Sequence, residues 1–341
     1  MSEYKKKIVF LGCPLDCDEQ YESITEKYNS ILPYTLSDDP YDWIVGLIRQ
    51  NAPRDSWEKL GSLDVPNWLR PQPSTSEIKW ISAENFVKFI ESQGCKDYAK
   101  LIQEQITQYI LPNIPCLVAV DHCLVGGPLQ ALSNYYGRDN LTIIVLDSHI
   151  DAIPLTKTLG AIQYDIETNP NSVYNSNDHL LFDRIDSYNA SSFFNQLINN
   201  DVIRADHLYL CGISDYPPKR AFRINDRRIV NYVNAFSELK NKGVNIISKK
   251  DCQMNPKRLQ ILLKQIKTPY VYISVDMDIG ARAAVEGVRF RNWKGITEQN
   301  LYKIVYYVQN IINNGVQLVG MDVTEFNARI AGANFDLGER V

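Results

Sequence analysis

LTIIVLDSHID, residues 141–151, joins an apolar run to three side chains of metal-binding type. An uninterrupted apolar run of this kind is typical of a buried strand in a parallel sheet. Alternate side chains share a face of a strand, so Asp147, His149 and Asp151 project to one side if the strand geometry continues. Uncompensated carboxylates at the end of a buried strand are very costly. The stretch therefore predicts a parallel α/β sheet with a cation at one strand end.

Two further segments have the same form. YVYISVDMD, residues 270–278, ends its apolar run at Asp276 and Asp278, which also share a face. CLVAVDH, residues 116–122, is an apolar strand that leads to His122. Ligands in parallel sheets gather at the carboxyl ends of strands, so we expect the three motifs to meet there. A pair of divalent cations is the natural counter-charge for this set.

The rest of the chain alternates between strand and helix patterns. Residues 297–314 repeat apolar side chains at helical spacing, and residues 83–111 predict a helix broken near Gly94. Apolar strand candidates lie near residues 7–12, 116–121, 141–147, 207–212, 243–248, 269–276 and 316–322. Strands that alternate with helices favour a three-layer α/β fold, with a central, mostly parallel sheet and helices on both faces.

Two segments do not follow this alternation. Residues 33–80 carry four of the five Trp residues and several Pro, and residues 152–187 form a long connection rich in Asn, Asp and Ser. Long connections in compact domains are often functional or disordered. We expect a single domain over residues 1–341, with the Trp- and Pro-containing segment as an excursion. The excursion is either a packed surface feature or a rim that shapes access to the site and contacts an extended substrate.

Composition limits the classes of partner. The formal net charge of −4 does not suggest general attraction to nucleic acid. The chain has no uninterrupted apolar stretch of about 18 residues, so no membrane span is expected, and its start lacks the pattern of a secretion signal. The seven Cys residues form no CxxC motif, which favours a reduced, cytoplasmic setting. Cys123, beside His122, is expected to be a small buried side chain.

The order of these motifs resembles the ureohydrolases, the arginase and agmatinase family. A His, then Asp-x-His-x-Asp, then Asp-x-Asp follow one another in the family order. GMDVTEFN, residues 320–327, looks like the family segment whose Glu grips the guanidinium group, and LGCPLD, residues 11–16, resembles the family's first strand and turn. The match is to separated motifs over roughly the whole chain. It implies an arginase-like fold and a ureohydrolase-like catalytic domain.

The resemblance implies a ligand set for two metal ions. The first ion would take His122, Asp147, Asp151 and Asp276, and the second would take His149, Asp147, Asp276 and Asp278. Imidazole and carboxylate ligands without thiolates suit manganese, zinc, iron or nickel, and the carboxylate excess and the resemblance favour two Mn²⁺ ions per chain. Two close cations lower the pKa of a bridging water and supply a hydroxide at neutral pH. Asp151 would also orient that hydroxide.

Two more residues receive catalytic roles by resemblance. Glu325 matches the family position that holds the planar guanidinium, which a carboxylate can bind through paired hydrogen bonds. Asp322, in the same motif, is expected to be structural. His179 lies in the long connection where arginases carry a His that shuttles a proton to the leaving amine, and the alternative is a loop His with local hydrogen bonds.

The departures from the family pattern bear on the substrate. Free-arginine hydrolases place an Asn where this chain has Ile153, and Pro217 stands where the family often has a second Asp near the substrate amino group. The usual third Asp and Pro after Asp-x-Asp are Ala281 and Arg282. These changes remove polar contacts to the head group of a free amino acid. The pattern looks like a peptide arginase, which converts arginine within a peptide to ornithine and releases urea.

Several alternatives stay open. The chain could hydrolyse free arginine, agmatine or another small guanidino compound. From other classes, a metal-dependent deacetylase or a non-catalytic metal-binding module also fits, and release of urea or acetate would separate them. The expected partner is an arginine-containing peptide or small guanidino substrate, with no nucleic acid and no membrane. The sequence is compatible with a homo-oligomer and leaves the native metal open.

Overall fold

One parallel sheet organises the molecule. The structure, a computed structural model, describes residues 6–30, 37–291, 294–327 and 331. Eight strands within these ranges pair in the order β2-β1-β3-β8-β7-β4-β5-β6, and every pair is parallel. The strands are β1 (Ile8–Cys13), β2 (Trp57–Ser62), β3 (Ile114–Ala119), β4 (Leu141–Leu146), β5 (Leu208–Ile213), β6 (Asn245–Ser248), β7 (Tyr270–Asp276) and β8 (Gln317–Thr324).

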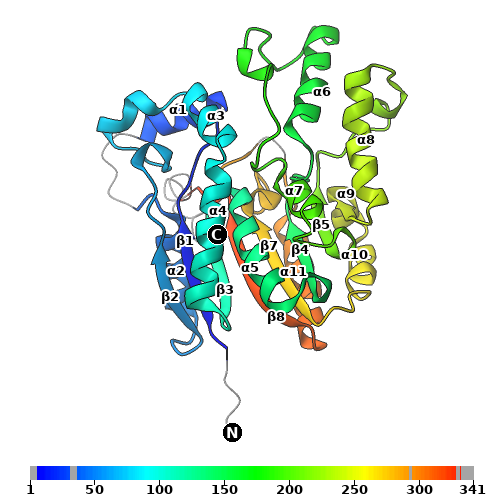
Figure 1. Ribbon diagram of the computed structural model, residues 1–341. Helices are drawn as coiled ribbons and strands as arrows, with labels where there is room; N and C mark the ends of the chain where they lie inside the picture. The colour runs from blue at the N-terminus through cyan, green and yellow to red at the C-terminus, as the bar shows by residue number, and fades with distance from the viewer. Residues whose placement is uncertain (1–5, 31–36, 292–293, 328–330, 332–341) are drawn as a thin grey trace.

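Helices cover both faces of the sheet (Figure 1). The α-helices of the described residues are α1 (Tyr21–Ser30), α2 (Pro40–Asn51), α3 (Ala83–Glu91), α4 (Gly94–Gln105), α5 (Gly126–Tyr136), α6 (Leu155–Thr168), α7 (Phe193–Asn199), α8 (Arg227–Asn241), α9 (Lys249–Met254), α10 (Pro256–Leu263) and α11 (Glu298–Asn313). One apolar cluster joins α3, α4, α5, α7 and α8 to the sheet, and α2, α9, α10 and α11 pack on the other face. The predicted three-layer α/β architecture is confirmed.

Alternation along single strands explains the two layers. In β3, Leu117 and Ala119 belong to the cluster under α4 and α5, whereas Cys116 and Val118 pack with α2. All six residues of β4 are buried, as a strand with helices on both faces requires. The carboxyl ends of the strands lie at the top of Figure 1, on the same side as α1, α3 and α6.

The edge strand β2 was missed by the sequence analysis, although the other seven strands and the helix at 297–314 are confirmed as β1, β3–β8 and α11. Its sequence, WEKLGS, has little apolar character, because an edge strand that is mostly exposed needs no apolar run. It lies within the segment 33–80 that we expected to be an excursion. Residues 33–36 of that segment lie outside the described residues.

Most Trp side chains of this segment serve packing. Trp57 meets Phe10 edge to face, with ring centroids 6.0 Å apart. Trp68 stacks on Phe86 at 5.5 Å. Trp80 is 47% exposed, so it is available to contact another molecule.

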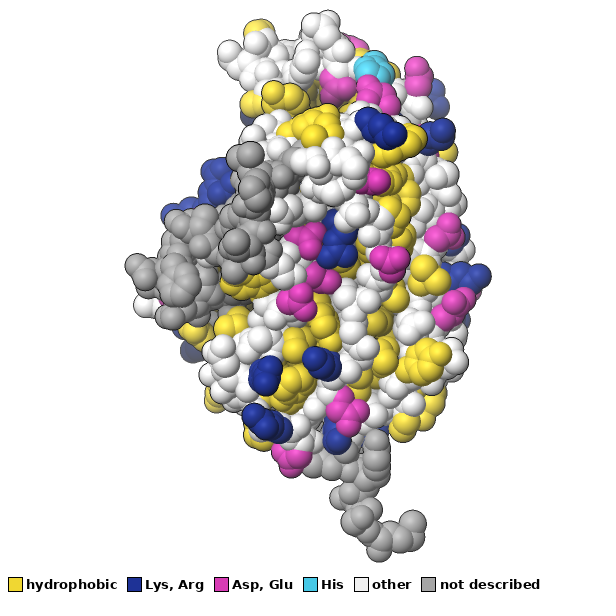
Figure 2. Space-filling view, turned by 90° about the vertical axis from the view of Figure 1, so that its left-hand side faces the viewer, with side chains coloured by type: hydrophobic (Ala, Val, Ile, Leu, Met, Phe, Trp, Pro, Cys, Tyr) yellow, Lys and Arg dark blue, Asp and Glu magenta, His cyan; other side chains and the backbone are white. Residues whose placement is uncertain are grey.

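The face of the molecule in Figure 2 carries mixed charge. On the face in Figure 2, Lys and Arg side chains are interspersed with Asp and Glu, and no large area of one sign is visible outside the grey atoms. Among the described helices, none combines the length and apolar character needed to cross a membrane.

Candidate metal centre

Four neighbouring strands carry the predicted site. His122 follows β3, Asp147 follows β4, Asp276 ends β7, and Glu325 follows β8. Because β3, β8, β7 and β4 are adjacent in the sheet, their carboxyl ends lie side by side. Strands β8 and β7 lie between β3 and β4, and the chain leads from β4 to β5 on one side but from β7 to β8 on the other. Such switch points are the usual ligand sites of open α/β sheets.

The structure brings the first predicted set of ligands together. One potential ligand atom from each residue lies within 4.8 Å of the others in the buried group of His122, Asp147, Asp151 and Asp276. Nδ1 of His122 is 2.8 Å from Asp151 Oδ2, 3.2 Å from Asp147 Oδ2 and 3.4 Å from Asp276 Oδ2. A single imidazole nitrogen facing three carboxylate oxygens is a typical precursor of a hard-metal site.

A second group shares Asp147 with the first. Asp147, His149 and Asp278 also place potential ligand atoms within 4.8 Å of one another. Nδ1 of His149 lies 2.7 Å from Asp278 Oδ2 and 3.8 Å from Asp147 Oδ1. Its side chain is 29% exposed, so this half of the centre faces the outside. The two groups together contain all six ligands predicted from the sequence.

The orientation of His122 is set by two residues that the sequence analysis did not connect with it. Nε2 of His122 lies 2.9 Å from the Ser274 hydroxyl, which donates to Asp322 Oδ1 at 3.0 Å. A proton on Nε2 leaves Nδ1 as the free ligand atom, the usual arrangement for a metal-binding His. Asp322 therefore has the structural role that was expected. Ser274 could have been found, because it lies two residues before Asp276 and so shares its face of β7.

The electrostatics of the centre call for added positive charge. Burial raises the pKa of Asp147 to about 7, and the carboxylates of Asp151 and Asp278 act in the same direction. Burial, with Asp278 and Asp147 nearby, also raises the pKa of Asp276 well above its usual value. Burial alone would lower the pKa of His122, but its hydrogen bonds to Asp147 and Asp151 raise it well above the usual value.

These residues fit a metal pair. Asp147 Oδ2 and Asp278 Oδ2 are buried, and each faces an imidazole nitrogen, Nδ1 of His122 at 3.2 Å and Nδ1 of His149 at 2.7 Å. Two imidazoles cannot neutralise four buried carboxylates, and divalent cations would supply the missing positive charge. The set of two imidazoles and four carboxylates, without thiolates, suits manganese and related divalent ions.

Two site residues are among the six described non-glycine residues with positive φ. Asp151 and Glu325 have φ values of +47° and +58°, in the left-handed region that non-glycine residues rarely adopt. Strain of this kind persists where the surrounding structure over-determines it, which is common at functional sites. Nearby, Gly212 has φ +111°, and a Cβ there would lie 2.6 Å from the Asp147 carbonyl oxygen. Glycine thus lets β5 approach the turn that carries the ligands.

Glu325 lies beside an internal guanidinium. Its carboxylate accepts from the backbone N–H of His122 at 3.3 Å, and its Oε2 is 3.8 Å from Nη1 of Arg289. Arg289 also pairs with Asp16, and its backbone N–H donates to the Glu325 carbonyl at 2.9 Å. Burial raises the pKa of Glu325 well above its usual value, although Arg289 opposes the shift. Arg289 was not singled out from the sequence, where nothing marks it as buried.

His179 is not brought together with the ligands. It lies in the 3₁₀ turn η6 (His179–Leu181), with its side chain 72% exposed and Nε2 3.7 Å from Glu84 Oε1 on α3. Its role as a proton shuttle stays a prediction. The connection from residue 152 folds into α6 and then runs on to this exposed turn, rather than returning along the strand ends.

Three solved structures with a similar fold are distant from this chain in sequence. The agmatine ureohydrolase of Thermoplasma volcanium is 17% identical, with a TM-score of 0.52 over 98% of this chain and 87% of that chain. The arginase of Bacillus caldovelox is 15% identical, with a TM-score of 0.55 over 95% and 92%. Trypanosoma cruzi formiminoglutamase, solved with Mn²⁺, is 10% identical, with a TM-score of 0.54 over 96% and 89%.

These distant similarities show the fold alone, and the family is identified by a comparison with family models. No curated protein matches the chain in sequence. A model of the arginase family matches residues 52–334, which include every ligand described above. Together with the parallel sheet and the cluster of acidic and His side chains at its strand ends, this match shows that the chain belongs to the arginase family, whose members are metal-dependent hydrolases of guanidino and amidine groups.

Proposed function

We propose that this arginase-family enzyme is a dinuclear manganese-dependent hydrolase that converts arginine residues in a peptide to ornithine and releases urea. The observation that carries the proposal is the convergence of six imidazole and carboxylate ligands beside a buried Glu. Manganese is favoured by the carboxylate excess. The presence of Mn²⁺ in the related formiminoglutamase supports this choice.

The six proposed ligands would form two sets that share Asp147. His122, Asp151 and Asp147 would hold one ion, and His149, Asp278 and Asp147 the other, with Asp276 as a second bridge. When bound, the pair supplies a water nucleophile that is activated at neutral pH. Asp151, on a strained turn beside His122, is placed to orient that nucleophile by accepting its proton in a hydrogen bond.

Glu325 is proposed to bind the substrate guanidinium. A carboxylate presents two acceptor oxygens to a planar cation, which fixes both its position and its orientation. Arg289 lies 3.8 Å from Glu325 Oε2, so a substrate guanidinium would share this carboxylate with an internal one. The backbone hydrogen bond from Arg289 to Glu325 also holds the strained turn in place.

The peptide substrate is proposed from what the site lacks. Ile153 is 3% exposed and packs in the core, and Pro217 is buried without a side-chain donor or acceptor. Neither can hydrogen-bond to the α-carboxylate or α-amino group of a free amino acid. An arginine inside a peptide carries neither charge, since both groups are amides. Exposed Trp80 is the side chain of the Trp-bearing segment most available to contact its neighbours.

The test compares substrates on manganese-loaded enzyme. Free arginine, agmatine and a peptide with one internal arginine are incubated in parallel, and urea release is followed. We expect the highest kcat/KM on the peptide, whose mass falls by CN₂H₂ for each arginine converted to ornithine. A kcat/KM on free arginine equal to or above that on the peptide would reject the peptide substrate and leave a hydrolase of small guanidino compounds.

A further inference from the structure

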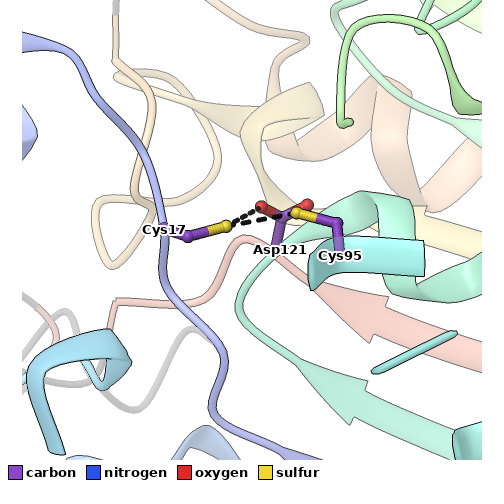
Figure 3. Close-up of side chains that lie close together, drawn as sticks. All are labelled: Cys17, Cys95 and Asp121. Carbon is purple, nitrogen blue, oxygen red and sulfur yellow. Dashed lines mark hydrogen bonds between the residues drawn. The ribbon is translucent and has the colours of Figure 1, made fainter. Parts of the chain in front are cut away.

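A second group of potential metal ligands lies behind His122. Cys17, Cys95 and Asp121 place a sulfur or oxygen atom each within 4.8 Å of one another, and all three residues are buried (Figure 3). The Sγ atoms of Cys17 and Cys95 are 3.4 Å apart, and Cys17 Sγ is 3.5 Å from Asp121 Oδ2. The Sγ of Cys123 lies within hydrogen-bonding reach of Cys95. None of these side chains is a ligand of the centre already described.

The three residues come from segments far apart in the sequence. Cys17 follows β1, Cys95 lies in the first turn of α4, and Asp121 connects β3 to the 3₁₀ turn η4 (His122–Val125). The three cysteines are each fully buried, and Asp121 is 5% exposed. The close approach of the Cys17 and Cys95 thiols to the Asp121 carboxylate therefore depends on tertiary packing and not on chain connectivity.

The distances suit a tetrahedral ion. Zn–S bonds of about 2.3 Å and Zn–O bonds of about 2.0–2.2 Å place neighbouring donor atoms about 3.5–3.8 Å apart. The observed separations of 3.4 and 3.5 Å are close to these values. A disulfide requires a sulfur–sulfur distance of about 2.05 Å, so Cys17 and Cys95 are not joined in this structure. Cys123 lies outside the group of three within 4.8 Å, but its fully buried thiol interacts with Cys95, which makes it the candidate for a fourth donor.

Asp121 divides its two oxygens between backbone and cluster. Oδ1 accepts from the backbone N–H of Cys123 at 3.0 Å and so caps η4. Oδ2 faces the thiol of Cys17, which is a weak donor. The nearby cation Arg289 already pairs with Asp16 and Glu325. A buried carboxylate oxygen whose only described partner is a thiol lacks adequate compensation, and a divalent cation would provide it.

We propose that Cys17, Cys95 and Asp121, with Cys123 as fourth ligand, bind a structural zinc ion. Thiolate ligands favour zinc, whereas the oxygen- and nitrogen-rich centre beside it favours manganese. Asp121 and His122 are consecutive residues, so one short turn carries a ligand of each site. The zinc ion ties the segment after β1 and the start of α4 to the turn that carries His122.

Cobalt(II) substitution tests the proposal on the full chain. After removal of bound metal under reducing conditions, cobalt(II) is added. Thiolate-to-cobalt charge-transfer bands in the near ultraviolet are expected to saturate at roughly one ion per chain, since a tetrahedral zinc site accepts cobalt(II). The imidazole–carboxylate centre gives no such bands. The cobalt(II) spectrum is recorded without any measurement of hydrolysis, so it tests the zinc site independently of the proposed function.

Matched variants assign the bands to the cluster. Cys17→Ser and Cys95→Ser should abolish them, whereas Cys252→Ser, at a buried cysteine in α9, should leave them intact. Asp276→Asn, which disturbs only the other centre, should also retain them. The wild-type spectrum remains decisive even if a cysteine variant does not fold. Reduced, folded wild-type protein without thiolate bands, or freshly purified protein with a Cys17–Cys95 disulfide, would overturn the proposal.

Discussion

The metal centre and the connection that carries His179 differ in how the chain holds them. The proposed ligands lie at the ends of strands that are hydrogen-bonded on both sides, and Asp147, Asp276 and Asp278 are almost completely buried. His179 lies on an exposed turn with one ion-pair contact, to Glu84. A strand end has one position set by the sheet, whereas a long connection can follow many courses. Chemistry that needs fixed geometry is therefore expected at the strand ends.

The largest effect is expected from Asp276→Ala. This change removes a carboxylate that faces His122 and is proposed to bridge both metal ions. We expect urea release to fall below detection and the metal content per chain to drop, as measured by elemental analysis of the folded variant. Asp139→Ala, at an exposed carboxylate, serves as the control. Full activity in Asp276→Ala would remove the basis for assigning the chemistry to the strand ends.

Arg289→Met tests whether the strand-end region depends on buried charge. Arg289 is 6% exposed and lies between Asp16 and Glu325. Removing one partner of a buried ion pair typically costs about 3–5 kcal/mol of unfolding free energy. Denaturant unfolding measures this change. Arg204→Met, at an exposed pair with Asp206 and Asp139, should cost less than about 1 kcal/mol. Equal losses of unfolding free energy in the two variants would contradict the greater dependence of the strand-end region on its buried charge.

Glu325→Gln separates binding from metal retention. The amide keeps the shape of the side chain but loses the charge that holds guanidinium. A hydrogen bond to a charged group is worth about 1.5–3 kcal/mol, so kcat/KM should fall by about one to two powers of ten. Metal content should be unchanged. Loss of the metals together with activity would instead make Glu325 a ligand or a structural residue.

The smallest effect is expected at His179. Its exposed imidazole contacts only Glu84 among the described residues, and ion pairs at such sites contribute about 0–1 kcal/mol. If His179 makes only this surface contact, His179→Asn should change kcat by less than about fivefold, since about 1.4 kcal/mol corresponds to a tenfold change. A large fall in kcat, with a shifted pH profile and unchanged KM, would instead support the predicted proton shuttle and show that the connection closes over the centre during turnover.

Strand ends could be predicted from the sequence, whereas contacts between segments far apart in the chain could not. Asp147 and Asp276 were found because buried parallel strands carry continuous apolar runs, and period-two alternation then fixes which side chains share a face. Edge strand β2 was missed because its exposed face needs no such run. The burial of Arg289 and the Cys17–Cys95 approach depend on packing between segments far apart in the chain, which leaves no periodic signal.

The place of β8 in the sheet has a consequence for biosynthesis. This strand lies between β3 and β7, so without it the sheet is two separate halves, β2-β1-β3 and β7-β4-β5-β6. His122 follows β3 and Glu325 follows the neighbouring strand β8, and these two hydrogen-bonded residues are 203 residues apart in sequence. Domains fold as the chain emerges from the ribosome, with long-range pairings forming late. The two halves must therefore wait for the last strand to be translated, and the nascent chain cannot take up its full metal complement before then.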